Sequence, residues 1–91
     1  MNFEWDENKR KSNISKHGLD FIDAERVFKG ATFTIEDTRF DYSENRYLTL
    51  GMLKGIVVVI AHLEEDDRIR VISMRKATNN EQKIYYKGFS Y

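Results

Sequence analysis

The apolar residues change their spacing near residue 32, and this change limits the folds open to the chain. Before it they recur at helical spacing, as in Phe21, Ala24 and Val27. After it they alternate with polar residues and include many β-branched side chains, which favours strands. Four strands are predicted, at Thr32–Glu36, Arg46–Leu53, Ile56–Leu63 and Arg68–Met74.

The connections between the last three of these strands are short. Lys54 and Gly55 form one connection, and the acidic run 64–67 forms the next. Parallel strands would need crossovers of a dozen or more residues, so we expect an antiparallel meander. The run Ile56–Ile60 is apolar at every position, which is typical of a central strand covered on both faces.

Capping residues mark the two helices that precede the strands. Asp6 is the predicted N-cap of a polar helix that runs to His17, with Gly18 in the left-handed position after it. Asp20 caps a second helix, which ends at Gly30 and carries the apolar stripe.

A third helix is predicted at the C-terminal end. Thr78 and Glu81 match the capping box, so this helix should begin at Asn79 and stop near Gly88. Residues 2–5 are expected to be extended. The predicted class is α+β, with two N-terminal helices, a four-stranded antiparallel sheet and a C-terminal helix.

Length and composition narrow the class of protein. With 91 residues, the chain is expected to form one domain over residues 1–91. It has no Cys, which excludes disulfides, thiolate metal sites and cysteine catalysis. The start has no apolar signal region, and the longest apolar run, Ile56–Ala61, is too short to span a bilayer. We expect a cytoplasmic protein that does not enter membranes.

Charge is divided unevenly along the chain. Residues 68–91 hold six Lys or Arg and one acid, Glu81, whereas residues 1–67 hold nine Lys or Arg and 14 acids. The two parts therefore carry formal charges of +5 and −5. A basic surface suits RNA, because Lys and Arg displace counterions from phosphates. The alternative is that these charges form the solvated faces of ordinary elements, and charge by itself favours that alternative.

Familiar catalytic, cofactor and metal motifs are absent from the sequence, and no cofactor is expected. The two His residues, His17 and His62, are too far apart in the sequence for a metal motif. His62 closes an apolar strand and is expected to be a partly buried structural residue. For His17, at the end of a polar helix, a functional and a structural role are equally open.

Two segments carry more polar groups than their positions require. Residues 39–46 link two strands, and residues 73–77 lead from a strand into the last helix. In a regular strand Arg75 shares a face with Ile69, Val71 and Ser73, and a guanidinium on such a face needs a partner or an anion. A structural ion pair of Arg75 with Asp41 or Glu44 is the open alternative.

These segments belong to an ordered set of residues that covers the chain from Phe3 to about Tyr85. The set consists of residues 3–9, residues 13–18, the stripe Phe21, Ala24, Val27 and Phe28, the stretch Asp41-Tyr42-x-Glu44-x-Arg46, and Arg68-x-x-x-Ile72-Ser73-x-Arg75-Lys76-Ala77-Thr78 with Glu81. It resembles the BrnT-type toxins of bacterial type II toxin–antitoxin pairs. The family commonly has Gly where this chain has Ser43.

The resemblance implies a RelE-like fold and a ribonuclease activity that blocks translation. It also implies neutralisation by a cognate BrnA-type antitoxin. That antitoxin carries a DNA-binding domain, so the toxin would meet DNA only in the complex.

A metal-independent ribonuclease can activate the ribose 2′-OH against the adjacent phosphate. This needs a base, an acid for the leaving 5′-oxygen, and cations for the developing charge. We expect Glu44 or His17 to act as the base or proton carrier and Lys16 to be the cation near the leaving group. Arg46 and Arg75 are expected to bind the phosphate.

Further residues are expected to bind RNA around this centre. Tyr42 would stack on a base, and Arg68, Lys76 and Lys83 would hold neighbouring phosphates. The alternative from another class is a non-catalytic module that binds nucleic acid or only the antitoxin, because a fold can outlast its catalytic groups.

Overall fold

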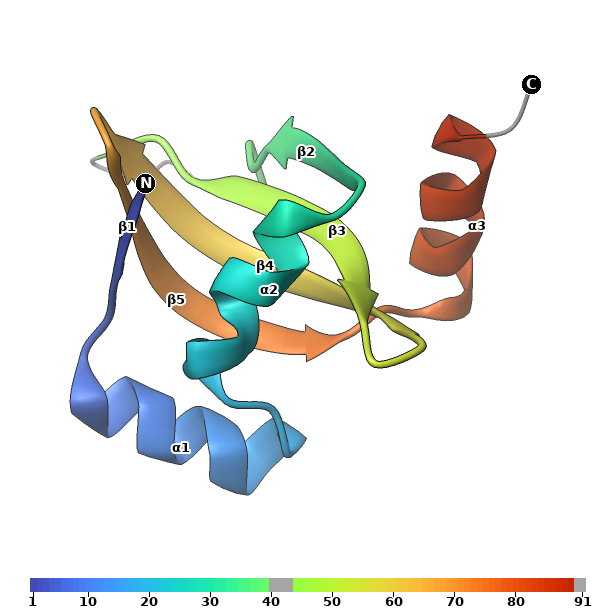
Figure 1. The fold of residues 1–91 in the computed structure, drawn as a ribbon. Coiled ribbons are helices and arrows are strands. Elements are labelled where there is room, and N and C mark those ends of the chain that lie inside the picture. The colour runs from blue at the N-terminus through green and yellow to red at the C-terminus, as the bar shows by residue number, and fades with distance from the viewer. Residues whose placement is uncertain (40–43, 90–91) are drawn as a thin grey trace.

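The computed structural model describes residues 1–39 and 44–89. The elements follow in the order β1 (Asn2–Glu4), α1 (Glu7–His17), the 3-10 turn η1 (Phe21–Asp23), α2 (Ala24–Lys29), β2 (Thr32–Glu36), β3 (Tyr47–Leu53), β4 (Ile56–Glu65), β5 (Arg68–Lys76) and α3 (Asn79–Gly88). Figure 1 shows α1 and α2 on one side of a curved sheet, with α3 packed at the far end. The α+β class is confirmed.

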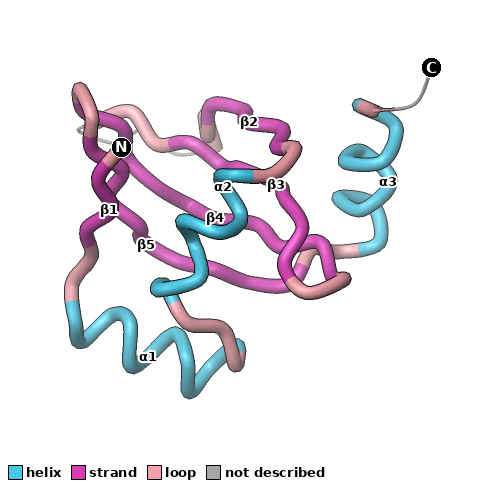
Figure 2. The backbone as a smooth tube through the Cα atoms, in the orientation of Figure 1, coloured by secondary structure: helices cyan, strands magenta, loops and turns pink. Residues whose placement is uncertain are grey.

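The sheet differs from the prediction in one strand. Its order is β1-β5-β4-β3-β2, and β2 to β5 form the expected antiparallel meander (Figure 2). The fifth strand, β1, pairs in parallel with the start of β5, with Asn2 opposite Arg68 and Glu4 opposite Arg70. The prediction of a purely antiparallel four-stranded sheet is therefore wrong. A segment of three residues is too short to show an alternating pattern, so its pairing could not be predicted.

The turn between β3 and β4 follows from its sequence. Lys54 and Gly55 both have positive φ, 49° and 84°, as in the two-residue turns that join antiparallel strands. The turn makes β3 and β4 neighbours. β4 is the central strand of the sheet, and its residues Val58, Val59 and Ile60 are almost completely buried. The prediction of a central strand covered on both faces is confirmed.

One face of the sheet packs against α1, η1 and α2, and we call it the helix-covered face. The core on this face includes Phe21, Val27, Ile60, Val71 and Met74. The second predicted helix is in fact divided, because residues 21–23 form the 3-10 turn and the α-helix begins only at residue 24. Phe21 and Val27 still lie on one side of this segment, so the predicted buried stripe is confirmed.

The other face of the sheet packs against α3, and we call it the α3 face. Its core includes Leu50, Val59 and Tyr85. The Tyr85 hydroxyl donates a hydrogen bond of 2.9 Å to the carbonyl of Ala31, which ties α3 to the start of β2. α3 begins with the predicted capping box at Thr78.

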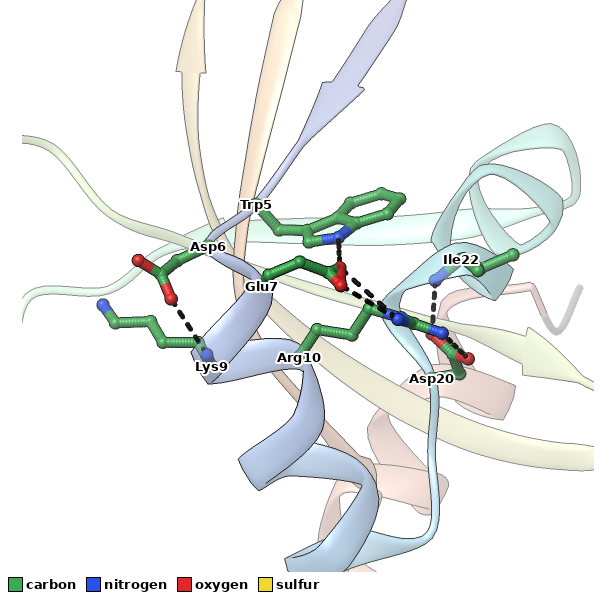
Figure 3. Close-up of polar contacts among 7 residues, drawn as sticks. All are labelled: Trp5, Asp6, Glu7, Lys9, Arg10, Asp20 and Ile22. Carbon is green, nitrogen blue, oxygen red and sulfur yellow. Dashed lines mark hydrogen bonds and ion pairs between the residues drawn. The ribbon is translucent and has the colours of Figure 1, made fainter.

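Polar side chains fix the N-terminal helix. Figure 3 shows the Arg10 guanidinium between Glu7 and Asp20, with bonds of 2.8 and 3.0 Å to the two Asp20 oxygens. The indole N–H of Trp5 donates to Glu7. The hydrogen bonds between Arg10 and Asp20 raise the pKa of Arg10 and lower that of Asp20. They hold α1 against the segment that leads into α2, although α1 has almost no apolar surface of its own.

Asn13 attaches α1 to the sheet. β1 covers the outer edge of β5 only at residues 68–70. Further along that edge, the Asn13 side chain accepts from the Met74 N–H at 3.1 Å and donates to the Met74 carbonyl at 2.9 Å. A side-chain amide thus replaces a neighbouring strand and satisfies backbone groups that burial would otherwise leave without partners.

Candidate functional site

Arg75 lies on the α3 face, because β5 contains a bulge. The pairing of β4 with β5 shifts between Ala61, opposite Ser73, and His62, opposite Val71. One extra residue in a strand reverses the face of every residue after it. Met74 therefore joins the core of the helix-covered face, while Arg75 pairs with Val59 on the other side. The prediction that Arg75 shares a face with Ile69 and Val71 is wrong for this reason.

The guanidinium of Arg75 is held by a carboxylate from α3. Its Nη1 and Nη2 atoms donate to the two oxygens of Glu81 at 2.7 and 2.9 Å. The hydrogen bonds from Arg75 lower the pKa of Glu81 to about 2, and Glu81 in turn raises the pKa of Arg75. Glu81 also accepts from the Thr78 N–H as part of the capping box. The start of α3 therefore fixes the position of Arg75.

Arg46 and Arg39 come from the connection between β2 and β3. The Asp37 N–H donates to the Arg46 carbonyl at 2.7 Å, which extends the ladder of these strands by one pair. By strand alternation Arg46 then lies on the same face as Leu48, and Asp37 on the same face as Ile35. Because Leu48 belongs to the core under α3, Arg46 and Asp37 lie on the α3 face.

Asp37 positions Arg39 as Glu81 positions Arg75. The carboxylate of Asp37 is buried and accepts from Nε and Nη2 of Arg39 at 2.8 and 2.9 Å. The positive charge of Arg39 opposes the rise in the pKa of Arg75, so the two cations act on each other. We call Arg39, Arg46 and Arg75, with the carboxylates Asp37 and Glu81, the arginine cluster.

The alternative of an ion pair of Arg75 with Glu44 is not what the described residues show, and the pair with Asp41 is not tested. Asp41 lies outside them, as does Tyr42, and the ion pair of Arg75 among the described residues is with Glu81. Glu44 is exposed just before β3 and two residues from Arg46. The chain connectivity therefore brings Glu44 near the cluster.

Lys16 and His17 lie in the last turn of α1. The helix starts beside the β1–β5 pair and reaches Met74 through Asn13, so it runs along β5 in the direction of that strand (Figure 1). Both residues follow Asn13 within about one turn, which places them toward the end of β5, on the side of the sheet opposite the α3 face where the Arg75 side chain lies. Both are exposed, and within residues 1–39 and 44–89 neither makes an ion pair with Glu44.

The three basic residues predicted to bind RNA are spread over the molecule. Lys76 is exposed at the end of β5 next to Arg75, and Lys83 is exposed on α3. Arg68 starts β5, which puts it about 23 Å from Arg75 along the strand, and it forms ion pairs with Glu4 and Glu65. Lys76 pairs with Val58, so its side chain points to the face opposite Arg75, and Arg68 lies at the other end of the strand.

His62 is completely buried on the helix-covered face. Its Nε2 atom lies 2.7 Å from the Thr49 hydroxyl, and its ring packs between Phe28 and Tyr47. Burial lowers its pKa to about 4, so the ring is neutral. His62 is more buried than expected. Within the described ranges, no group of three or more His, Asp or Glu side chains is placed to hold a metal ion, and none of the helices there is long and apolar enough to cross a membrane.

The cluster has the chemistry of an anion site. Planar guanidinium groups bind phosphate oxygens through paired hydrogen bonds, and groups already oriented by carboxylates lose little freedom on binding. Sequence reasoning found Arg46 and Arg75 but missed Asp37, Arg39 and the second role of Glu81. The polar segment 39–46 pointed to Arg39. The double role of Glu81 could not be predicted, because it depends on the bulge that turns Arg75 toward α3.

The sequence matches the model of a known protein family. A family model described as ribonuclease toxin, BrnT, of type II toxin–antitoxin system matches residues 5–81. Among curated proteins, none matches the sequence. The matched residues include α1, the whole meander, the arginine cluster and the first turn of α3.

Proposed function

The chain belongs to the BrnT family of ribonuclease toxins of type II toxin–antitoxin systems, and we propose that it is a metal-independent, RelE-like endoribonuclease that inhibits translation in the cytoplasm. The observation that carries this proposal is the arginine cluster. Arg75 and Arg39 are each held by a carboxylate, Glu81 and Asp37, and strand alternation puts Arg46 on the same face of the sheet. Such preorganised cations can stabilise the charge that develops on a phosphate during cleavage.

The proposed reaction uses the RNA's own 2′-hydroxyl as the nucleophile. A base removes its proton, the 2′-oxygen bonds to the adjacent phosphorus, and the bond from phosphorus to the 5′-oxygen breaks. An acid returns a proton to that 5′-oxygen. The products are a 2′,3′-cyclic phosphate and a 5′-hydroxyl end. Each step needs only proton transfer and charge stabilisation, which side chains can supply without a metal.

The roles follow from position. Arg46 and Arg75 would bind the nonbridging oxygens of the phosphate that is attacked, and Glu44 or His17 would serve as base or proton carrier. Lys16 would stabilise the leaving 5′-oxygen. The attachment of α1 to Met74 directs the end of the helix that carries Lys16 and His17 toward the end of β5, so an RNA that meets both these residues and Arg75 would have to pass around the edge of β5.

Residues around the cluster would bind the rest of the RNA. Tyr42 would stack on a base, and Lys76 and Lys83 would hold neighbouring phosphates. Arg68 would bind RNA only if the bound RNA extended to the start of β5, where Arg68 already forms ion pairs with Glu4 and Glu65. It is the weakest member of the proposed set.

Membership of a type II toxin–antitoxin family implies an antitoxin partner. We propose that this partner is of the BrnA type and carries a DNA-binding domain. The toxin would then meet DNA only within the complex. RNA remains the proposed substrate of the toxin itself.

Expression in bacteria tests the proposed function. Inducing the chain should stop growth and fragment RNA, and co-expressing the small neighbouring gene product should prevent both effects. Purified protein should cleave RNA equally well in excess EDTA, because no metal takes part. Growth arrest with intact RNA, caused equally by Glu44→Gln and Arg75→Ala variants, would instead indicate a non-catalytic binding module.

A further inference from the structure

Arg39 has no role in the site as derived from the sequence, yet its setting matches that of Arg75. Each guanidinium is held by two hydrogen bonds to one carboxylate, from Asp37 for Arg39 and from Glu81 for Arg75. The Arg39 side chain is 60% exposed, whereas that of Asp37 is 3% exposed. The carboxylate is therefore the buried anchor, and the guanidinium projects from it.

The two arginines use different edges for these bonds. Arg39 binds Asp37 through Nε and Nη2, and Arg75 binds Glu81 through Nη1 and Nη2. A guanidinium has more than one edge that can donate paired hydrogen bonds. Binding a carboxylate at one edge orients the whole planar group.

The chain places these two cations on the same face of the sheet. Asp37 and Arg75 both lie on the α3 face. Glu81 raises the pKa of Arg75, and the positive charge of Arg39 acts in the opposite direction. Like charges held in mutual range are stabilised when an anion lies near both. A phosphate group has oxygens enough to accept from two guanidiniums at once.

We propose that Arg39 and Arg75 form a two-arginine binding site for the RNA phosphates, with Asp37 and Glu81 as positioning residues. The inference rests on the proposed function, because it adds Arg39 to the same RNA-binding face. It assigns Arg39 to substrate binding and Asp37 to orienting Arg39.

Salt-dependent binding of a 2′-O-methylated single-stranded RNA, which cannot be cleaved through its 2′-oxygen, tests the proposal. Each phosphate contact contributes a slope of about 0.7 in log affinity against log salt concentration for single strands. Arg39→Ala should lower the slope by roughly this amount and weaken binding about 10-fold. Arg26→Ala is the matched control, because Arg26 is exposed on α2 over the opposite face.

A double-mutant cycle tests whether the two arginines act together. If they bind the same phosphate, the loss of log affinity in Arg39→Ala/Arg75→Ala should be smaller than the sum of the single losses. Asp37→Asn should weaken binding less than Arg39→Ala, because the charge of Arg39 remains. If Arg39→Ala unfolds because the buried Asp37 loses its hydrogen bonds from Arg39, the double variant Asp37→Asn/Arg39→Ala, which also removes the carboxylate charge, is measured in place of Arg39→Ala.

The outcomes separate the proposal from the proposed function. If Arg39→Ala binds like Arg26→Ala while Arg75→Ala binds more weakly, the two-arginine site is wrong and the RNA-binding role of Arg75 stands. If both arginine variants bind more weakly but the native protein cleaves no unmodified RNA, the site is supported and the ribonuclease function fails.

Discussion

At the scale of single residues, buried polar side chains decide how this chain holds its shape. Asn13 is the clearest case, since it is the buried residue of α1 and makes three hydrogen bonds, to Leu19 and to both backbone groups of Met74. The sequence shows only an Asn in a polar helix. Its role depends on the uncovered edge of β5, which no local pattern reveals.

Replacing Asn13 with Ala should destabilise the protein. The change leaves the Met74 N–H and carbonyl buried without partners, so the free energy of unfolding should fall by about 3 kcal/mol. Asn8→Ala, at an exposed position of the same helix, should change it by less than about 0.5 kcal/mol. Urea denaturation measures both variants, and equal stabilities would contradict the edge role of Asn13.

His62 predicts how stability depends on pH. Its pKa is about 4 in the folded protein, against 6.5 ordinarily. The unfolded chain therefore binds a proton as the pH falls through 6.5, while the folded protein does so only near 4. The contribution of His62 to stability is complete above pH 6.5 and is lost progressively toward pH 4, by up to about 3 kcal/mol.

Urea denaturation at several pH values between 7.5 and 4 tests this expectation. The His62→Gln variant lacks the buried imidazole, so its stability should fall less steeply than that of the native protein over this interval. His17→Gln is the control, because His17 is exposed, and it should keep the native dependence. Identical curves for all three proteins would show that burial of His62 does not set the response.

The site was only partly predictable at this scale. Arg46 and Arg75 stood out because they carry charge at the ends of apolar strands. The face of Arg75 was predicted incorrectly, since Ile69, Val71, Ser73 and Arg75 alternate as if the strand were regular. The adjacent apolar residues Val71 and Ile72 were a sign of the bulge.

At the scale of elements, the helix ends and the meander followed from local signals. Gly18 takes the left-handed conformation at the end of α1, and Thr78 with Glu81 starts α3 as expected. Such caps depend on residues within one turn, so sequence shows them directly. The parallel pairing of β1 joins residues from opposite ends of the chain, and three residues carry too little pattern to indicate it.

Gly51 predicts how α2 packs on the sheet. A Cβ atom at this position would lie 2.5 Å from Cγ1 of Val27 and 3.2 Å from Cγ2 of Thr32. Gly51→Ala should therefore push α2 away from β3 and lower the free energy of unfolding by about 2 kcal/mol. Adding Val27→Ala removes the clashing methyl group, so the two losses should be less than additive.

Gly88→Ala is the control for that experiment. Its Cβ would meet Phe33 at 3.4 Å, an ordinary contact, so stability should change little. Urea denaturation of the four variants, including Val27→Ala alone, completes the cycle. Strict additivity of Gly51→Ala and Val27→Ala would contradict a direct contact between α2 and β3 at this point.

At the scale of the whole molecule, the division of charge along the sequence is only partly a division in space. Arg68 and Arg70 at the start of β5 are neutralised by Glu4 and Glu65. Arg75 and the exposed Lys76 lie at the other end of the same strand, beside α3 and its Lys83. The basic surface is therefore smaller than the sequence suggests, because Glu81 and Asp37 also pair with Arg75 and Arg39.

The rate at which purified protein cleaves RNA, compared between the native chain and Arg75→Ala, tests the catalytic role of the arginine cluster most directly. An arginine that stabilises the transition-state phosphate contributes roughly 10²–10³-fold to the rate. We expect a loss of that size in Arg75→Ala with the fold intact by circular dichroism, and less than about a threefold change in the Arg26→Ala control. Equal rates for native and Arg75→Ala proteins would contradict a catalytic site at the arginine cluster.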